Sequence, residues 1–156
     1  MDLEPDLGLL FGAAHEGIQA RLARALGDLD LTARQYCVLG KADSGTLTQG
    51  QIAEAALLDK TTMVVTLDAL QTAGLARREP HPNDRRARVV VTTAEGSRLF
   101  EKAAAVVRGL YDEVLGALPA AQRDVLVEAL TSLIATGGPL DVPADDPRPR
   151  RSSRRG

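Results

Sequence analysis

The residues best suited to chemistry in this sequence are arginines gathered in one short stretch. Between positions 77 and 88, five arginines stand against two acidic residues, Glu79 and Asp84, which leaves a local balance of five minus two, or +3. The whole chain of 156 residues has a formal net charge of −2, so this positive charge is local. A planar guanidinium group binds phosphate with paired hydrogen bonds and enters the narrow, electronegative minor groove of DNA. The stretch therefore indicates a site suited to nucleic acid, and its five arginines are Arg77, Arg78, Arg85, Arg86 and Arg88.

Two short runs of strand-forming residues flank these arginines and predict a β-hairpin. The expected strands are 75–79 and 88–93, and the second contains three consecutive valines, residues 89–91, with strong strand preference. Between them, residues 80–84 read Pro-His-Pro-Asn-Asp, which is dense in turn formers. The arginines are therefore expected on an exposed two-stranded arm, with Asp84 close to its tip.

A short helix with its own cap is expected ahead of the hairpin. Thr48 and Gln51 have the spacing of a capping box, in which each side chain binds an otherwise unpaired backbone amide of the other. The residues that follow supply a short apolar face, which is expected to pack inward and consists of Ile52, Ala53, Ala56 and Leu57.

A second helix is expected directly after the first. Asp59 can cap it, because a carboxylate accepts from free amides and favours the positive end of a helix. Gly74 is the expected C-terminal stop. One stripe at i, i+4 and i+7 spacing should be buried: Met63, Leu67 and Leu70. The opposite face remains for solvent or a ligand and holds Lys60, Thr61, Val64, Val65 and Asp68.

This order of elements resembles the winged helix-turn-helix of the multiple-antibiotic-resistance regulator (MarR) family. The matching stretches are TQGQIAEAALLDKTTMVVTLDALQTAGLARRE and PNDRRARVVVTTAEG, and the resemblance covers roughly residues 3 to 136. Asp84 and Arg86 form the Asp-x-Arg pattern that is the family's most specific short mark. The resemblance implies a homodimeric transcriptional regulator, a repressor, that binds a pseudo-palindromic operator in double-stranded DNA. The implied DNA-binding residues are Thr48, Gln49, Lys60, Thr61, Thr62, Val65, Asp84, Arg85, Arg86 and Arg88.

One departure from the family affects base recognition. Family members often carry a basic or polar residue where this chain has Val65 and Ala69. Thr61, Thr62 and apolar contacts are therefore expected to recognise the bases, because threonine and valine methyls can contact thymine methyls. Thr62 has an alternative role as a capping partner of Asp59.

The expected fold class is mainly α with a small β-hairpin wing. A single domain is predicted over residues 1–138, with the winged helix-turn-helix at about 31–93. Helices at about 3–27 and 94–136 have apolar faces, and the small DNA-binding lobe has no core left to bury them. The resemblance implies that these helices form the dimer.

The tail, residues 139–156, is predicted to be disordered because it has few apolar residues to bury. It carries five arginines, which could touch DNA phosphates without sequence preference or could simply be solubilising.

The resemblance also implies an effector. Many family members release DNA when a small, often aromatic or anionic, ligand enters a crevice beside the DNA-binding lobe, and others respond to oxidation of a cysteine. The candidate effector residues are His15, Tyr36 and Cys37. The alternative for each is a packed or structural residue, since cysteine is among the most buried residue types.

Other classes of function are disfavoured. The chain has no phosphate-binding loop, His-Glu-x-x-His or Gly-x-Ser-x-Gly pattern, so no enzyme and no cofactor is expected. Two histidines and one cysteine do not suit a common zinc site, and no metal is expected. The single cysteine and the lack of a signal peptide or a membrane-length apolar run predict a cytoplasmic protein without a membrane partner. The rival function is a winged helix that binds another protein rather than DNA.

Overall fold

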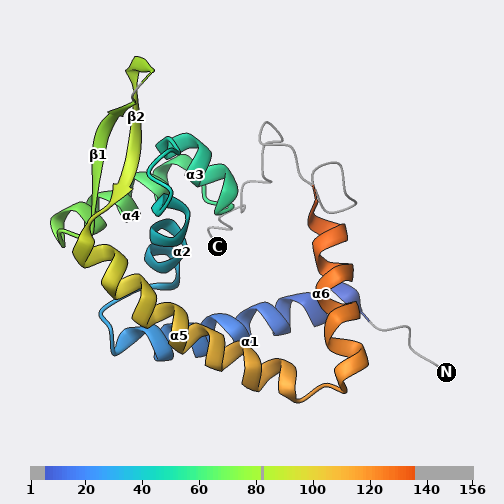
Figure 1. Ribbon diagram of the computed structural model, residues 1–156. Helices are drawn as coiled ribbons and strands as arrows, with labels where there is room; N and C mark the ends of the chain where they lie inside the picture. The colour runs from blue at the N-terminus through green and yellow to red at the C-terminus, as the bar shows by residue number, and fades with distance from the viewer. Residues whose placement is uncertain (1–5, 82, 136–156) are drawn as a thin grey trace, which may run out of the picture. The chain divides into compact units, whose positions relative to one another are not determined.

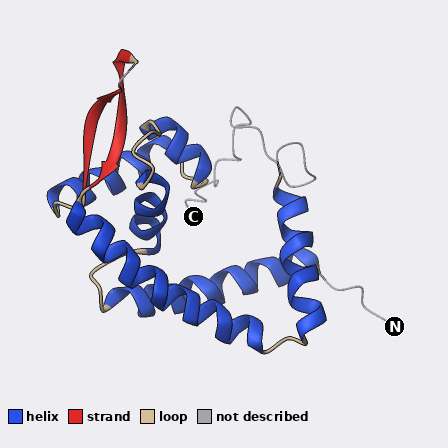
Figure 2. Ribbon diagram, viewed as in Figure 1, coloured by secondary structure: helices blue, strands red, loops and turns tan. Residues whose placement is uncertain are grey.

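The computed structural model describes residues 6–81 and 83–135, apart from the side chains of Arg85 and Arg86. Within this part the chain is helical except for one antiparallel hairpin, which confirms the predicted fold class (Figures 1 and 2). The described residues fall into two compact units, divided between Asp112 and Glu113. The elements are α1 (Leu7–Gly27), α2 (Ala33–Ala42), α3 (Gln49–Ala55), α4 (Lys60–Thr72), β1 (Ala76–His81), β2 (Asp84–Thr92), α5 (Ala94–Gly116) and α6 (Ala120–Ile134).

The two central helices begin where their caps were predicted. The Thr48 amide donates to Gln51 Oε1 at 2.9 Å and the Gln51 amide donates to Thr48 Oγ1 at 3.3 Å, which completes the capping box of α3. The Thr62 amide donates to Asp59 Oδ1 at 2.9 Å at the start of α4. These bonds stabilise each helix end by roughly 1 kcal/mol.

Two further caps set the starts of α1 and α2. The first helix begins at Leu7 rather than at Leu3, because the Asp6 carboxylate accepts from the Leu9 amide at 3.0 Å. The second begins after Thr32, whose side chain forms a reciprocal capping box with Gln35. Both follow the same local rule that identified the caps of α3 and α4.

An aliphatic core holds the first unit together. Met63, Leu67 and Leu70 are fully buried, which confirms the inner stripe predicted for α4. Burying a side chain of this size stabilises a fold by roughly 1.5–3 kcal/mol. The other large residues with no more than 2% exposure come from α1, α2, α3, β2 and α5, and they are Leu26, Val38, Leu39, Ile52, Val89, Val90 and Val107.

Leu57 departs from the predicted apolar face of α3. Its side chain is 81% exposed, and its backbone has a positive φ of 53° in the turn between α3 and α4. The helix ends at Ala55, so the periodicity that placed Leu57 on the inner face stops two residues before it. The prediction that Leu57 packs inward was therefore wrong.

The hairpin is longer than predicted. Ala76 pairs with Thr92, Glu79 with Val89 and His81 with Asp84, so the pairing continues through residues that were assigned to the turn. The register shifts between Pro80 and His81, a position where proline lacks an amide to donate. Most residues in the outer half of the hairpin are charged or are turn formers. The strand preference of the three valines, residues 89–91, identified only the buried inner part of β2. Backbone pairing carries the arm outward beyond that base.

The junction between the hairpin and α5 is tightly packed. Gly74 has a φ of 72° and ends the α4 segment as predicted, and its carbonyl accepts from Thr93 Oγ1 at 2.7 Å. The Thr93 amide donates to the Leu75 carbonyl at 3.0 Å, and the Gly96 amide donates to Thr93 Oγ1 at 3.0 Å. A Cβ atom on Gly96 would lie 2.0 Å from the Leu75 carbonyl oxygen. Only glycine therefore fits at position 96.

Both ends of the described chain carry exposed apolar residues. The first half of α1 exposes Leu7, Leu9, Leu10 and Phe11. In the second unit, α6 has no buried residue and bears a groove of about 450 Å³. Leu118, Ala121, Gln122, Val125, Leu126 and Ala129 line that groove. No helix among the described residues is long and apolar enough to cross a membrane.

Candidate nucleic-acid interface

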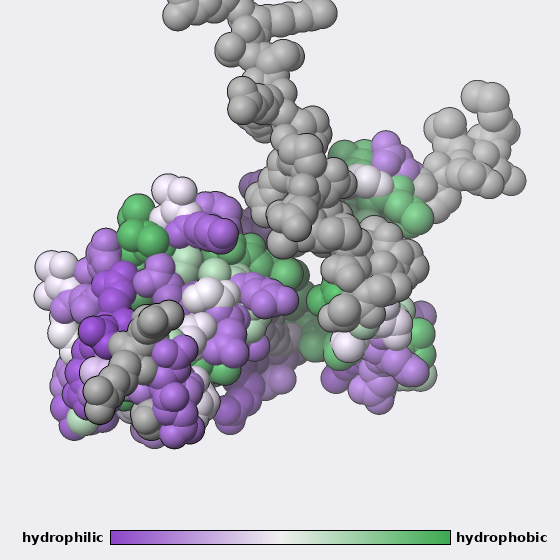
Figure 3. Space-filling model, turned by 90° about the horizontal axis from the view of Figure 1, so that it is seen from above, coloured by the Kyte–Doolittle hydropathy of each residue, from purple (hydrophilic) through white to green (hydrophobic). Residues whose placement is uncertain are grey.

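The outer face of α4 is exposed as the sequence predicted. Lys60, Thr61 and Asp68 are all exposed, and the side chain of Val65 is 65% exposed. Val64 is 41% exposed. A helix that buries one stripe in the core and presents the opposite stripe to solvent is held rigidly for contact with a ligand. Figure 3 looks down on the hairpin end of the first unit, where most of the surface is hydrophilic with a few hydrophobic residues between.

Thr62 belongs to the cap of α4. Its hydroxyl donates to Asp59 Oδ2 at 2.7 Å, in addition to the bond from its amide to Oδ1. The hydroxyl hydrogen is therefore used inside the protein, which favours the capping role over base contact for this residue.

Thr48 and Gln49 lie where α3 meets the hairpin. Thr48 forms an isolated β-bridge with Val89 besides capping α3, and the Val90 amide donates to the Leu47 carbonyl at 2.9 Å. Gln49 Oε1 accepts from Arg78 Nε and Nη2, each at 3.2 Å. Both side chains thus have structural partners at the base of the hairpin.

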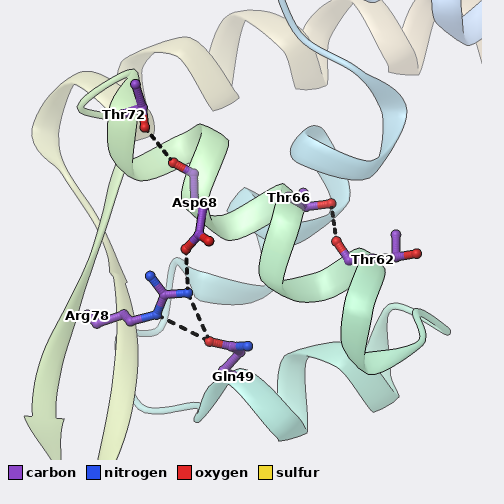
Figure 4. A network of polar contacts seen from close by, with 6 residues as sticks. All are labelled: Gln49, Thr62, Thr66, Asp68, Thr72 and Arg78. Atoms are coloured by element: carbon purple, nitrogen blue, oxygen red, sulfur yellow. Dashed lines mark hydrogen bonds and ion pairs between the residues drawn. The ribbon is translucent and has the colours of Figure 1, made fainter.

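Arg78 connects three elements through one guanidinium group. Besides its two bonds to Gln49 on α3, its Nη2 donates to Asp68 Oδ1 on α4 at 2.9 Å (Figure 4). The Arg78 side chain itself lies on β1 and is 29% exposed. The network therefore fixes the hairpin against α3 and α4, and it places a positive charge beside the one carboxylate on the predicted DNA-facing surface of α4.

Removing Arg78 should weaken DNA binding more than folding. The Arg78→Ala variant removes the link from the hairpin to Gln49 and Asp68. The negative charge of Asp68 then has no neighbouring guanidinium and repels the DNA phosphates. We expect about a tenfold loss of affinity, since charge-assisted bonds of partly exposed pairs contribute on the order of 1 kcal/mol and the exposed carboxylate adds repulsion. Fluorescence anisotropy on a DNA duplex would measure it. Adding Asp68→Ala to the variant should restore part of the affinity, and fully additive losses would contradict the coupling.

The remaining hairpin arginines differ in their surroundings. Arg77 Nε donates to Glu79 Oε1 at 2.5 Å, so this pair is neutral overall. Arg88 and Asp84 lie on β2, where Asp84 is exposed. The backbones of Arg85 and Arg86 belong to β2 near its start, while their side chains lie outside the described residues. Arg77 pairs with Glu79 and Arg78 pairs with Asp68.

The effector candidates occupy different surroundings. His15 is exposed on α1. Tyr36 on α2 stacks on Phe100 of α5, with ring centroids 5.2 Å apart, and Gly40 lies so close that an added Cβ would sit 2.8 Å from the Phe100 ring. Cys37 is half-buried. Among the described residues, no group of three or more histidine, cysteine and acidic side chains could hold a metal ion.

Burial raises the pKa of the Tyr36 phenol above its usual 10.0, and the neighbouring Tyr111 and Cys37 add to the increase while Arg108 opposes it. The folded protein thus holds the Tyr36 proton after the unfolded chain has lost it. The free energy of unfolding should consequently decrease as pH rises above about 10. Denaturant unfolding across this range should show the decline, and Tyr36→Phe should reduce it. An unchanged pH profile in that variant would rule out the phenol as its source.

The capped helix pair, the exposed helix face and the arginine-bearing hairpin define a winged helix-turn-helix protein. The family description that matches residues 29–87 is the MarR family. The transcriptional regulator HosA from Escherichia coli is 33% identical over 108 residues, which are 69% of this chain and 80% of that protein. The chain belongs to the MarR family of transcriptional regulators.

Solved structures agree with this assignment. A mutant of MarR from Escherichia coli complexed with operator DNA has a TM-score of 0.73 and 28% identity, covering 80% of this chain and 91% of that one. CouR from Rhodococcus jostii RHA1, bound to p-coumaroyl-CoA, has a TM-score of 0.73 and 27% identity, covering 81% of this chain and 90% of that one.

Proposed function

We propose that the protein is a homodimeric repressor that binds an operator in double-stranded DNA and releases it when a small molecule binds. The observation that carries the proposal is the outward face of α4, which is exposed, anchored by a buried stripe and flanked by the arginine-bearing hairpin. The operator complex of the MarR mutant supports the same use of this fold.

The proposed contacts divide between two grooves. The face of α4 that holds Lys60, Thr61 and Val65 enters the major groove, where base edges are distinguishable. Arg86, with Arg85 beside it in sequence, enters the adjacent minor groove, and Arg88 binds phosphate. Thr48, Gln49, Thr62 and Asp84 support these contacts from the ends of α3, α4 and β2 rather than reading bases.

The proposed dimer uses the exposed apolar residues at both ends of the described chain. Leu7, Leu9, Leu10 and Phe11 on α1 need a partner, as do the apolar residues of α6. A second copy would provide one for both. Two-fold symmetry then places two copies of α4 about 34 Å apart, one turn of DNA, and predicts a pseudo-palindromic operator. The basic segment 139–156, proposed to add phosphate contacts, lies outside the described residues.

The proposed effector is an organic molecule with aromatic or anionic character. CouR solved with p-coumaroyl-CoA supports ligand control in a protein of this fold. Tyr36 and Cys37 on α2 and His15 on α1 are the proposed contact residues, and Tyr36 meets α5 through its stack on Phe100. A ligand at Tyr36 and Cys37 could move α2 and, through it, α4.

Selection from a random duplex library would test the DNA-binding function when the operator sequence is unknown. The purified protein should enrich a pseudo-palindrome whose half-sites are about 10 base pairs apart, centre to centre. Light scattering on the same preparation should give the mass of two chains. Enrichment of no sequence over several rounds, from protein that is folded and dimeric, would favour the protein-binding module instead.

A further inference from the structure

We infer that α4 reads thymine methyl groups in the major groove through Val65, so that the operator half-site carries thymine where this side chain meets it. The inference rests on the proposed DNA-binding function and specifies the base that this helix selects. Its basis is that internal bonds already use most polar groups that could have read bases.

Internal hydrogen bonds occupy most of the polar side chains along α4. The Thr62 hydroxyl donates to the Asp59 carboxylate at 2.7 Å. The buried Thr66 hydroxyl donates to the Thr62 carbonyl at 2.7 Å (Figure 4). The Thr72 hydroxyl donates to the Asp68 carbonyl at 2.9 Å. The Asp68 carboxylate accepts from Arg78 at 2.9 Å. A base that approached these groups would have to displace an existing bond.

Few of the usual readers of purines are present on this helix. Arginine or lysine binds guanine, and asparagine or glutamine binds adenine, through paired hydrogen bonds. The α4 sequence KTTMVVTLDALQT contains neither arginine nor asparagine, and its one lysine, Lys60, is at the first position of the helix. Its one glutamine, Gln71, is half-buried with its Oε1 atom inside the protein. Gln49, near the start of α3, has its Oε1 atom bonded to Arg78.

The central exposed stripe that remains is short and largely apolar. Thr61, Val65 and Ala69 follow one another at i, i+4 and i+8 and are all exposed. Val65 is the most exposed large hydrophobic residue on α4, at 65% exposure against 41% for Val64. Thymine differs from cytosine in the major groove by its C5-methyl group, and two branched methyls of valine can pack on that group. Each buried methyl or methylene group contributes about 0.8 kcal/mol, which corresponds to about fourfold in affinity.

Deoxyuridine substitution isolates this contact. Duplexes that carry the selected operator would be made with thymine or deoxyuridine at one half-site position at a time, and titrated with the dimer at fixed salt. At one position the wild-type protein should bind the deoxyuridine duplex about fourfold more weakly. The Val65→Ala variant should bind the two duplexes equally, because it lacks the methyls that make the contact. Val65 is exposed and alanine favours helix, so the variant should fold normally.

Val106→Ala is the matched control. Val106 is an exposed valine of α5, at 40% exposure, and its variant should keep the wild-type ratio between thymine and deoxyuridine. If the protein binds the operator specifically and its affinity is unchanged by deoxyuridine at every half-site position, the inference is overturned and the proposed function remains intact. A ratio that persists in Val65→Ala would also overturn it. Failure of selection to enrich any operator would instead count against DNA binding itself.

Discussion

The Gly96→Ala variant is expected to lose at least about 2 kcal/mol of folding free energy, because overpacking of this kind typically costs about 1–3 kcal/mol. The added Cβ would lie 2.0 Å from the Leu75 carbonyl oxygen and 2.8 Å from Thr92 Cγ2. The first of these atoms is backbone and accepts the Thr93 amide, so it cannot move without breaking the junction between β1 and α5. Chemical denaturation would measure the loss.

Gly109→Ala is the control on the same helix. A Cβ at position 109 would meet nothing within 4 Å, and alanine restricts the unfolded chain. This variant should gain about 0.5–1 kcal/mol of stability. If both variants shift in the same direction by similar amounts, the packing account of position 96 fails.

Arg86→Ala is expected to weaken DNA binding about tenfold or more with little change in folding. Arg86 is proposed to enter the minor groove, where its charge displaces a counterion and its guanidinium meets the electronegative floor. The loss should be similar across operator variants, and the slope of log affinity against log salt should decrease by about one. Anisotropy titrations at several salt concentrations would give both quantities.

The charge-matched control is Arg98→Ala. Arg98 pairs with Glu95 on α5, outside the hairpin, and its removal changes the net charge by the same amount. Its affinity and salt slope should stay close to those of the wild type. Equal slopes for wild type and Arg86→Ala, with both proteins folded, would mean that Arg86 does not contact DNA.

Local rules predicted the elements that local interactions determine. The Thr48–Gln51 capping box, the Asp59 cap, the buried stripe of α4 and the stop at Gly74 all follow from residues within a few positions of one another. The capping box at Thr32 obeys the same rule and starts α2 at Ala33. Where a helix ended early, as α3 does at Ala55, periodicity misplaced Leu57, which lies two residues beyond the end.

Contacts between distant residues could not be predicted in this way. Arg78 was grouped with the phosphate-binding arginines because its partners, Gln49 and Asp68, lie 29 and 10 positions away. The stack of Tyr36 on Phe100 likewise depends on how α2 meets α5. The outer half of the hairpin was missed for another reason, since backbone pairing holds its charged residues without any apolar pattern.

Binding of the purified protein to the intergenic DNA beside its own gene tests the central claim most directly. A gel shift would be run with unrelated competitor DNA and repeated at several salt concentrations. We expect a discrete complex that survives excess competitor and weakens steeply as salt rises. Binding that is no tighter than to unrelated duplex, on this DNA and on the random library alike, would contradict sequence-specific DNA recognition by this protein.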